Sequence, residues 1–346
     1  MASQRISYLD GLRGVAASLV LVSHMAEQIF AATKAPWLDR TLDYVGFGRI
    51  GVVAFFCVSG FVIPFSLRAP HALRHFALSR FFRLYPAYWL SLALFLAIAG
   101  AFGMVFPAKQ VLANITMAQA VAGQPDVIGV YWTLFYELVF YALCAGTFAV
   151  GWLGSGVTVM LGMGLLAIGA SLVAVLHFID FPIKPPLGLL GYLSIMVFGT
   201  VCRFAWLEDD PVVRRRLPLA LAGILIMVTL VGLLGYAHGG RPDRPISDFV
   251  GVYLGIGLFL AAFRFKAALS GPVMTWMGRI SYSLYLLHSI VALVCAKAAA
   301  EVGSDITKVA ILLTVLPLSF LLAHLSATFV ERPMIELGHR LARARA

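Results

Sequence analysis

The 346-residue chain is 61% hydrophobic and only 12% charged, and its mean hydropathy is +0.92. Soluble domains average roughly 45–50% apolar and about 25% charged residues, so this composition excludes a soluble globular protein and indicates one embedded in lipid. The net charge of +10 does not indicate nucleic-acid binding, because the arginines lie in short segments between apolar runs, which is the pattern of membrane topology. We therefore expect the lipid bilayer, and no nucleic acid, as a partner.

Apolar runs along the chain predict an all-α, polytopic membrane helix bundle. A crossing needs about 20 mostly apolar residues, and about ten runs qualify as transmembrane helices. Lys and Arg are more frequent in the segments that are cytoplasmic if the N-terminus is inside, and an even number of spans then places both termini in the cytoplasm. The predicted spans are residues 8–27, 47–66, 87–106, 131–150, 154–176, 187–205, 217–236, 248–263, 281–299 and 307–329.

The longest segment between spans, residues 67–86, mixes basic and aromatic side chains. It predicts an amphipathic helix that lies in the cytoplasmic interface and turns into the next span at Pro86. Its simplest role is an anchor to acidic lipid. Because no repeat and no soluble second domain is evident, we expect one membrane domain over residues 1–346.

The first span carries ionisable side chains that lipid disfavours. Arg13 and His24 are eleven residues apart, close to three helical turns, so they share one face roughly 16 Å apart along the axis. Asp10 lies near that face, where it can pair with Arg13. An ionisable group inside a span costs roughly 2.5–3.5 kcal/mol and normally faces a pathway or a site. The alternative is a helix-packing ion pair with an interfacial His24.

The fourth span contains Glu137 in YWTLFYELVFY, beside Trp132 and Tyr136. In the predicted orientation Glu137 and His24 both lie in the outer halves of their spans. A buried carboxylate beside a histidine holds the ring's tautomer and stabilises the imidazolium, so Glu137 is a candidate to orient His24. The alternative is a structural glutamate that accepts hydrogen bonds from tyrosine hydroxyls.

The ninth span places Tyr285 and His288 three residues apart, on one helix face. A lone buried histidine is more often a core residue than a catalytic one, so both interpretations stay open for His288. The four cysteines lie in apolar runs without C-x-x-C spacing, and no metal is expected. The motifs of P-loop ATPases, zinc proteases and α/β-hydrolases are absent from the sequence.

Six segments now stand in order along the chain: YLDGLRGVAASLVLVSH, FFCVSGFVI, RFFRLYPAYW, WTLFYELVFY, GRISYSLYLLH and FVERP. Together they resemble the acyltransferase-3 family of integral membrane O-acyltransferases. The resemblance runs from residue 8 to about 333 and covers the membrane domain alone, without the hydrolase-like domain that some members append. The family's signature of Arg, ten residues and His is met by Arg13 and His24, and its R-x-x-R by Arg80 and Arg83.

One position departs from the family pattern. The acidic span motif usually has two adjacent acids, whereas here Glu137 is followed by Leu138. A role that needs the second carboxylate is therefore not supported.

The resemblance implies an acyl-CoA-dependent membrane O-acyltransferase. The reaction moves an acyl group, most often acetyl, from cytoplasmic acyl-CoA to a hydroxyl of an extracytoplasmic glycan or another small acceptor. Acyl-CoA is then a donor substrate, and no permanently bound cofactor is expected. The Ala-, Gly- and Arg-rich usage suggests a GC-rich bacterial genome, which places the protein in the bacterial cytoplasmic (inner) membrane, where it takes part in polysaccharide O-acetylation.

We assign roles to the candidate residues on this basis. His24 suits a general base at neutral pH, and Arg80 and Arg83 suit the phosphates of CoA. Arg13 guides the pantetheine arm or stabilises negative charge on the thioester oxygen. Supporting or substrate-binding roles are expected for Asp10, Trp132, Tyr136, Tyr285 and His288.

Two alternatives remain at this point. The transfer is either direct, in a ternary complex, or proceeds through an acyl-histidine intermediate. A proton-coupled transporter or flippase is the rival function, since intramembrane Arg, His and Glu also serve proton coupling, although no inverted repeat is evident.

Overall fold

The computed structural model describes residues 6–30, 46–67, 72–182, 185–236, 245–300 and 304–343. Over these residues the chain forms helices and no strand, which confirms the predicted all-α fold class. The chain divides into two compact units. The first is Met1–Trp37, Ala69–Phe135 and Lys266–Ala346, and the second is Leu38–Arg68 and Tyr136–Phe265. The single domain expected over 1–346 stays a prediction.

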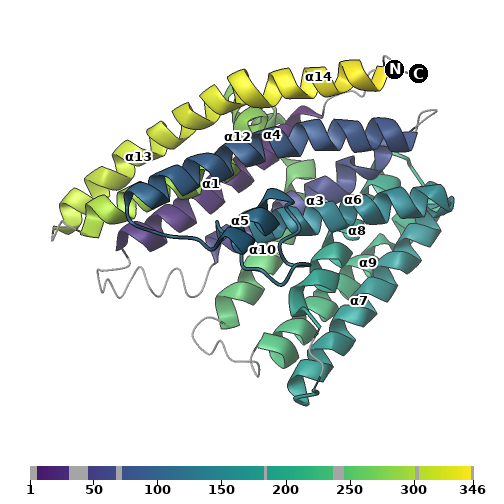
Figure 1. Ribbon diagram of the computed structural model, residues 1–346. Helices are drawn as coiled ribbons and strands as arrows, with labels where there is room; N and C mark the ends of the chain where they lie inside the picture. Colours follow the sequence, from purple (N-terminus) through teal and green to yellow (C-terminus); the bar gives the residue numbers. More distant parts are fainter. Residues whose placement is uncertain are drawn as a thin grey trace. The chain divides into compact units, whose positions relative to one another are not determined.

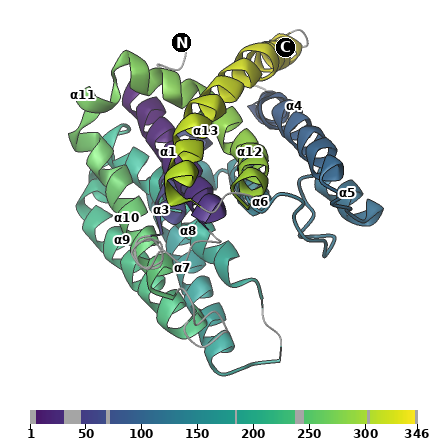
Figure 2. The same ribbon diagram turned by 90° about the vertical axis from the view of Figure 1, so that its left-hand side faces the viewer.

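The first unit pairs helices from the two ends of the sequence. Helix α1 packs along α12, and α14 lies along α4 (Figures 1 and 2). The helices of this unit are α1 (Ser7–Phe30), α4 (Ala72–Ala101), α5 (Ala108–Ile115), α11 (Lys266–Leu269), α12 (Pro272–Ala300), α13 (Asp305–Ser326) and α14 (Arg332–Arg343), with the π-helix η4 (Ala327–Glu331) between the last two.

The second unit is built around α8, which packs against α3, α7 and α9. Helix α9 begins where Asp210 caps it, since the carboxylate accepts the amide hydrogens of Val212 and Val213 at 2.9 and 3.1 Å, as N-cap aspartates do. The helices are α3 (Phe47–Val62), α7 (Gly156–Phe178), α8 (Leu187–Trp206), α9 (Pro211–Leu230) with the π-helix η3 (Val231–Tyr236), and α10 (Pro245–Arg264). Helix α6 (Tyr131–Ala149) begins in the first unit and continues in the second.

In the described part of the chain, eight helices are long and apolar enough to cross a membrane. They coincide with eight of the predicted spans. The other two predicted spans are also helical: α1 has a lower hydropathy because it carries Arg13, His24 and Glu27, and the apolar part of α10 is short, Phe249–Arg264. The count of ten crossings and the cytoplasmic location of both termini stay predictions.

The expected turn at Pro86 is wrong. Helix α4 runs unbroken from Ala72 to Ala101 with Pro86 inside it, so the basic residues and the span belong to one helix. Proline is tolerated inside membrane helices. On the two sides of Pro86, helix α4 is joined to α12: the Tyr282 hydroxyl of α12 donates to the Leu84 carbonyl at 2.8 Å, and the Ser91 hydroxyl of α4 donates to the Leu286 carbonyl at 3.1 Å. The interfacial position of 67–86 stays a prediction, and residues 68–71 lie outside the described residues.

Glycines bring the backbones of α1 and α12 into contact. A Cβ atom on Gly278 would lie 2.0 Å from the Asp10 carbonyl oxygen, and one on Gly14 would lie 2.6 Å from the Met277 Cβ. Small residues allow such close helix approach in membranes. Gly14 lies against residues 277–278, and ten residues further along each helix His24 lies against His288. Helices α1 and α12 are therefore parallel neighbours.

We predict that Gly278→Ala destabilises the protein whereas Gly100→Ala does not. The added methyl group of the first variant meets backbone that cannot move without separating α1 from α12, and overpacking of this kind costs about 1–3 kcal/mol. A Cβ on Gly100, in α4 of the same unit, meets nothing within 4 Å. Thermal unfolding in detergent measures both variants, and equal midpoints would contradict the close crossing.

Candidate functional site

Two histidines meet where α1 and α12 run side by side. The ring centroids of His24 and His288 are 5.3 Å apart, and the ring planes differ by 29°, a stacked arrangement. Each side chain was a separate candidate in the sequence. The structure brings them together because residues 24 and 288 both lie ten residues beyond the glycine crossing, on parallel helices.

The two rings of this histidine pair have unlike surroundings. His288 is 1% exposed, and among the described residues neither of its ring nitrogens has a hydrogen-bond partner. The His24 side chain is 38% exposed. A buried polar group left without a partner costs about 1–3 kcal/mol, so the position of His288 calls for a reason beyond packing.

A carboxylate that the sequence interpretation missed accompanies His24. The Glu27 Oε2 atom lies 3.6 Å from the His24 Nδ1 atom, one helical turn further along α1. The Ser23 hydroxyl donates to the Glu27 Oε1 atom at 3.2 Å, which holds the carboxylate in place. The i, i+3 spacing was the available signal. Glu27 therefore occupies the position beside His24 for which Glu137 was the candidate.

Tyr285 supports His288 from the other side. Its ring lies 5.8 Å from the His288 ring, and its hydroxyl is fixed by the Thr133 hydroxyl at 2.7 Å and the Val130 carbonyl at 3.2 Å. Trp132, a predicted supporting residue, precedes Thr133 on α6 and is half-buried. The supporting position of Tyr285 thus follows from hydrogen bonds to the start of α6.

The segment before α6, which contains Val130, is held in place by hydrogen bonds to polar side chains. The Asn114 side chain of α5 donates to the Pro125 carbonyl at 3.0 Å and accepts the Val127 amide hydrogen at 3.0 Å. Burial raises the pKa of Asp126 in this loop, and the hydrogen bond from Gln119 offsets part of that shift. The folded loop binds the Asp126 proton more tightly than the unfolded chain, so its stability falls as the pH rises above the ordinary aspartate pKa.

Arg13 and Asp10 lie at the other end of the α1–α12 contact. Asp10 and Gly14 meet α12 at residues 277–278, about 15 Å along the axis from His288. Arg13 and Asp10 are both half-buried in α1. The structure therefore confirms α1 as one helix through Arg13 and His24, and the specific Asp10–Arg13 ion pair stays a prediction.

A basic cluster forms where α4 and α14 pack together. The Arg80 guanidinium lies 5.4 Å from the Phe76 ring centroid, and the rings of His75 and His339 are 6.0 Å apart. The charges of His75, Arg343 and Arg80 all act on His339. Like charges gathered in this way favour an anionic ligand.

The sequence interpretation found only part of this basic cluster. It included Arg80 and Arg83, which lie three residues apart on α4. It missed His339 and Arg343, because their approach to α4 depends on the close packing of Gly338 against Phe82.

The second unit holds Glu137 and Tyr136. The Tyr141 hydroxyl donates to the Glu137 Oε1 atom at 2.7 Å, the tyrosine contact that one interpretation expected. The Tyr136 ring lies 5.8 Å from that of Tyr192. Because Glu137 and His24 belong to different units, their predicted pairing stays a prediction.

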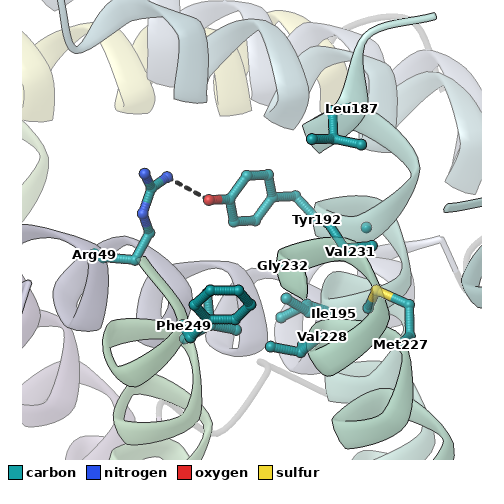
Figure 3. Close-up of a pocket in the computed structure, with 12 residues that line it drawn as sticks. Arg49, Leu187, Tyr192, Ile195, Met227, Val228, Val231, Gly232 and Phe249 are labelled. Carbon is teal, nitrogen blue, oxygen red and sulfur yellow. Dashed lines mark hydrogen bonds between the residues drawn. The ribbon is translucent and has the colours of Figure 1, made fainter. Parts of the chain in front are cut away.

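The same unit contains an apolar cavity of about 50 Å³. Figure 3 shows the Arg49 guanidinium donating to the Tyr192 hydroxyl across it, with Phe249 and Met227 among the apolar walls. Residues of α3, α8, α9, η3 and α10 line the cavity. Its polar groups already bond to each other, so it offers a pocket for a small apolar group and no acid–base pair.

The fold and the site define a multi-pass membrane protein whose paired histidines and basic cluster share one helical unit. Residues 6–327 match the acyltransferase-3 family pattern, described as an acyltransferase domain. The chain belongs to the acyltransferase-3 family, which confirms the resemblance found in the sequence.

Two curated relatives agree with this assignment. The chain is 29% identical over 321 residues to the exopolysaccharide production protein ExoZ of Rhizobium meliloti (strain 1021), covering 87% of this chain and 93% of ExoZ. It is 31% identical over 150 residues to the acyltransferase MdmB of Streptomyces mycarofaciens, covering 40% of this chain and 38% of MdmB. No solved structure gives a significant match.

We predict that Tyr285→Phe lowers both stability and acyl transfer, because the lost hydroxyl frees the ring that supports His288. Each lost hydrogen bond is worth about 1 kcal/mol. Tyr253→Phe is a matched control, since its hydroxyl bonds to Thr229 at 2.6 Å and to the Leu225 carbonyl at 3.3 Å in the second unit. Thermal unfolding and thiol release from acetyl-CoA should separate the two variants: both lose stability, and only Tyr285→Phe loses turnover. Equal turnover in both variants would contradict the supporting role of Tyr285.

Proposed function

We propose that the protein transfers an acyl group, acetyl in the first instance, from cytoplasmic acyl-CoA to a hydroxyl group of an extracytoplasmic glycan. The observation that carries this proposal is the placement of the histidine pair and the basic cluster in one helical unit. The name of the relative ExoZ refers to exopolysaccharide production, which favours a glycan hydroxyl over other acceptors. The membrane is the bacterial cytoplasmic membrane, with both termini inside.

The donor binds at the basic cluster in this proposal. Arg80 and Arg83 bind the phosphates of CoA, because guanidinium groups form paired, charge-assisted hydrogen bonds with phosphate oxygens. Arg343 adds positive charge from α14 near Arg80 and His339. The contact of Leu84 with Tyr282 places this end of α4 beside the N-terminal half of α12, on the side where Arg13 lies. The pantetheine arm then extends past Arg13 toward the histidine pair.

His24 is the general base. It takes the proton of the acceptor hydroxyl as the oxygen attacks the thioester carbonyl, and it returns that proton to the departing CoA thiolate. Glu27 holds the ring through the Nδ1 side and stabilises the imidazolium while it carries the proton. Glu137 remains a second candidate for this orienting role.

We predict that His24→Ala abolishes transfer, with a loss of about 10²–10⁴-fold in kcat, the usual contribution of a general base. Thiol release from acetyl-CoA by the purified protein measures the effect. His177→Ala is the control, since His177 bonds to the Pro185 carbonyl at the end of α7 and has no place in the proposed reaction. Substantial turnover in His24→Ala would reject His24 as the base, and substrate transport without thiol release would favour a transporter.

We predict that Arg80→Gln combined with Arg83→Gln raises the Kd for acetyl-CoA about 10²–10⁴-fold, because two guanidinium groups are lost and hydrogen bonds to charged groups are each worth about 1.5–3 kcal/mol. Arg216→Gln is the control for lost charge, since Arg216 is exposed on α9. Calorimetry or a fluorescent CoA analogue measures the affinity. An unchanged Kd in the double variant would remove these arginines from the donor site.

A further inference from the structure

The reaction needs a hydrogen-bond donor at the thioester oxygen as well as a base. Negative charge develops on that oxygen when the acceptor attacks, and a donor placed there in a dry site is often the largest single contribution to catalysis. His24 fixes where the acceptor oxygen lies, because a base must be within hydrogen-bond reach of the proton that it takes. The thioester carbon then lies about 3 Å from the acceptor oxygen, and the oxyanion donor must be close to that carbon.

Distance excludes Arg13 from this task. Arg13 and His24 lie on one helix, eleven residues or about 16 Å apart along the axis. The His288 ring, by contrast, lies 5.3 Å from the His24 ring, centroid to centroid. Glu27 and His288 both lie beside the base, and of these two His288 is the one that can donate a hydrogen bond to an oxyanion.

The surroundings of His288 suit a donor rather than a second base. No described acidic residue forms an ion pair with it, and both ring nitrogens are buried without a hydrogen-bond partner. A neutral imidazole always carries one N–H group. That N–H group has already lost its water, so a hydrogen bond to a developing oxyanion is gained at nearly full strength.

We propose that His288 donates a ring N–H hydrogen bond to the thioester carbonyl oxygen and stabilises the oxyanion of the tetrahedral intermediate. The assignment rests on the proposed function and specifies how the histidine pair divides the work. His24, which is half-exposed and contacts Glu27, accepts and returns the proton. His288 stabilises the negative charge on the oxygen.

The step balances without a covalent bond to His288. The acceptor oxygen bonds to the carbonyl carbon while its proton passes to His24, and the carbonyl electron pair moves to the oxygen that His288 contacts. Collapse of the intermediate re-forms the carbonyl and breaks the carbon–sulfur bond. The thiolate leaves and takes the proton from His24. In an acyl-histidine route, by contrast, a ring nitrogen bonds to the acyl carbon.

His288 is 1% exposed and stacks against the His24 ring, whose side chain is 38% exposed. The proposed role therefore requires the thioester oxygen to reach the edge of the His288 ring beside His24.

Two variants test the role of His288. His288→Phe fills the same space without a donor, and it should lower kcat about 10²–10³-fold, the usual loss for one oxyanion donor, with little change in the KM for acetyl-CoA. His288→Gln keeps an N–H group and should retain at least a tenfold higher kcat than His288→Phe. Thiol release is measured with acetyl-CoA as donor and a hydrolysate of surface polysaccharide as acceptor, and thermal unfolding checks that both variants fold.

The outcomes separate this role from the proposed function. A wild-type protein that releases no thiol contradicts the proposed function and the role with it. A wild-type protein that is active while His288→Phe keeps its kcat contradicts only the role. A His288→Gln variant as inactive as His24→Ala, or an acyl group found on His288 by mass spectrometry, also overturns it. The His288→Gln variant decides the question even where His288→Phe does not fold.

Discussion

The close approach of α1 and α12 at their glycines sets the positions of the groups in the first unit. Gly278 lies against the Asp10 carbonyl, and Gly14 lies against Met277, so the two backbones touch where any side chain would separate them. This contact fixes the register of two parallel helices. Ten residues further along each helix, the same register places His24 against His288. If one helix shifted by one residue relative to the other, its histidine ring would turn by about 100° around the helix axis, and the two rings would no longer be in contact.

The same register separates the two ends of the reaction. Arg13 lies level with the glycine crossing, and the basic cluster of α4 joins α12 near Tyr282. Along α12 the histidine pair lies about 15 Å beyond the glycine crossing and about 9 Å beyond Tyr282. A donor with an anionic head and a long arm can span such a distance. The family assignment favours acyl transfer over coupled transport.

The helices and several residues of the candidate site could be predicted from the sequence. Charged residues in apolar runs identified Arg13 and His24, since lipid penalises them regardless of the fold, and the motifs identified the family. Contacts between helices that are distant in the sequence could not be predicted. His339, for example, reaches His75 only through the packing of α14 on α4. Glu27 lies one turn from His24, and the i, i+3 spacing that indicates this contact is visible in the sequence. The turn expected at Pro86 was wrong, since α4 continues through this proline, as membrane helices tolerate.

The two partners of the histidine pair are separated by 263 intervening positions, and the whole second unit is synthesised between them. During translation α1 enters the membrane early with its ionisable groups, long before α12 emerges from the ribosome. Parallel neighbours cannot be joined by a short hairpin, so α12 must find α1 after the intervening helices are in place. A nascent chain that has not yet reached α12 lacks His288 and therefore the histidine pair. Under the proposed function, such a chain is inactive until most of the protein has been synthesised.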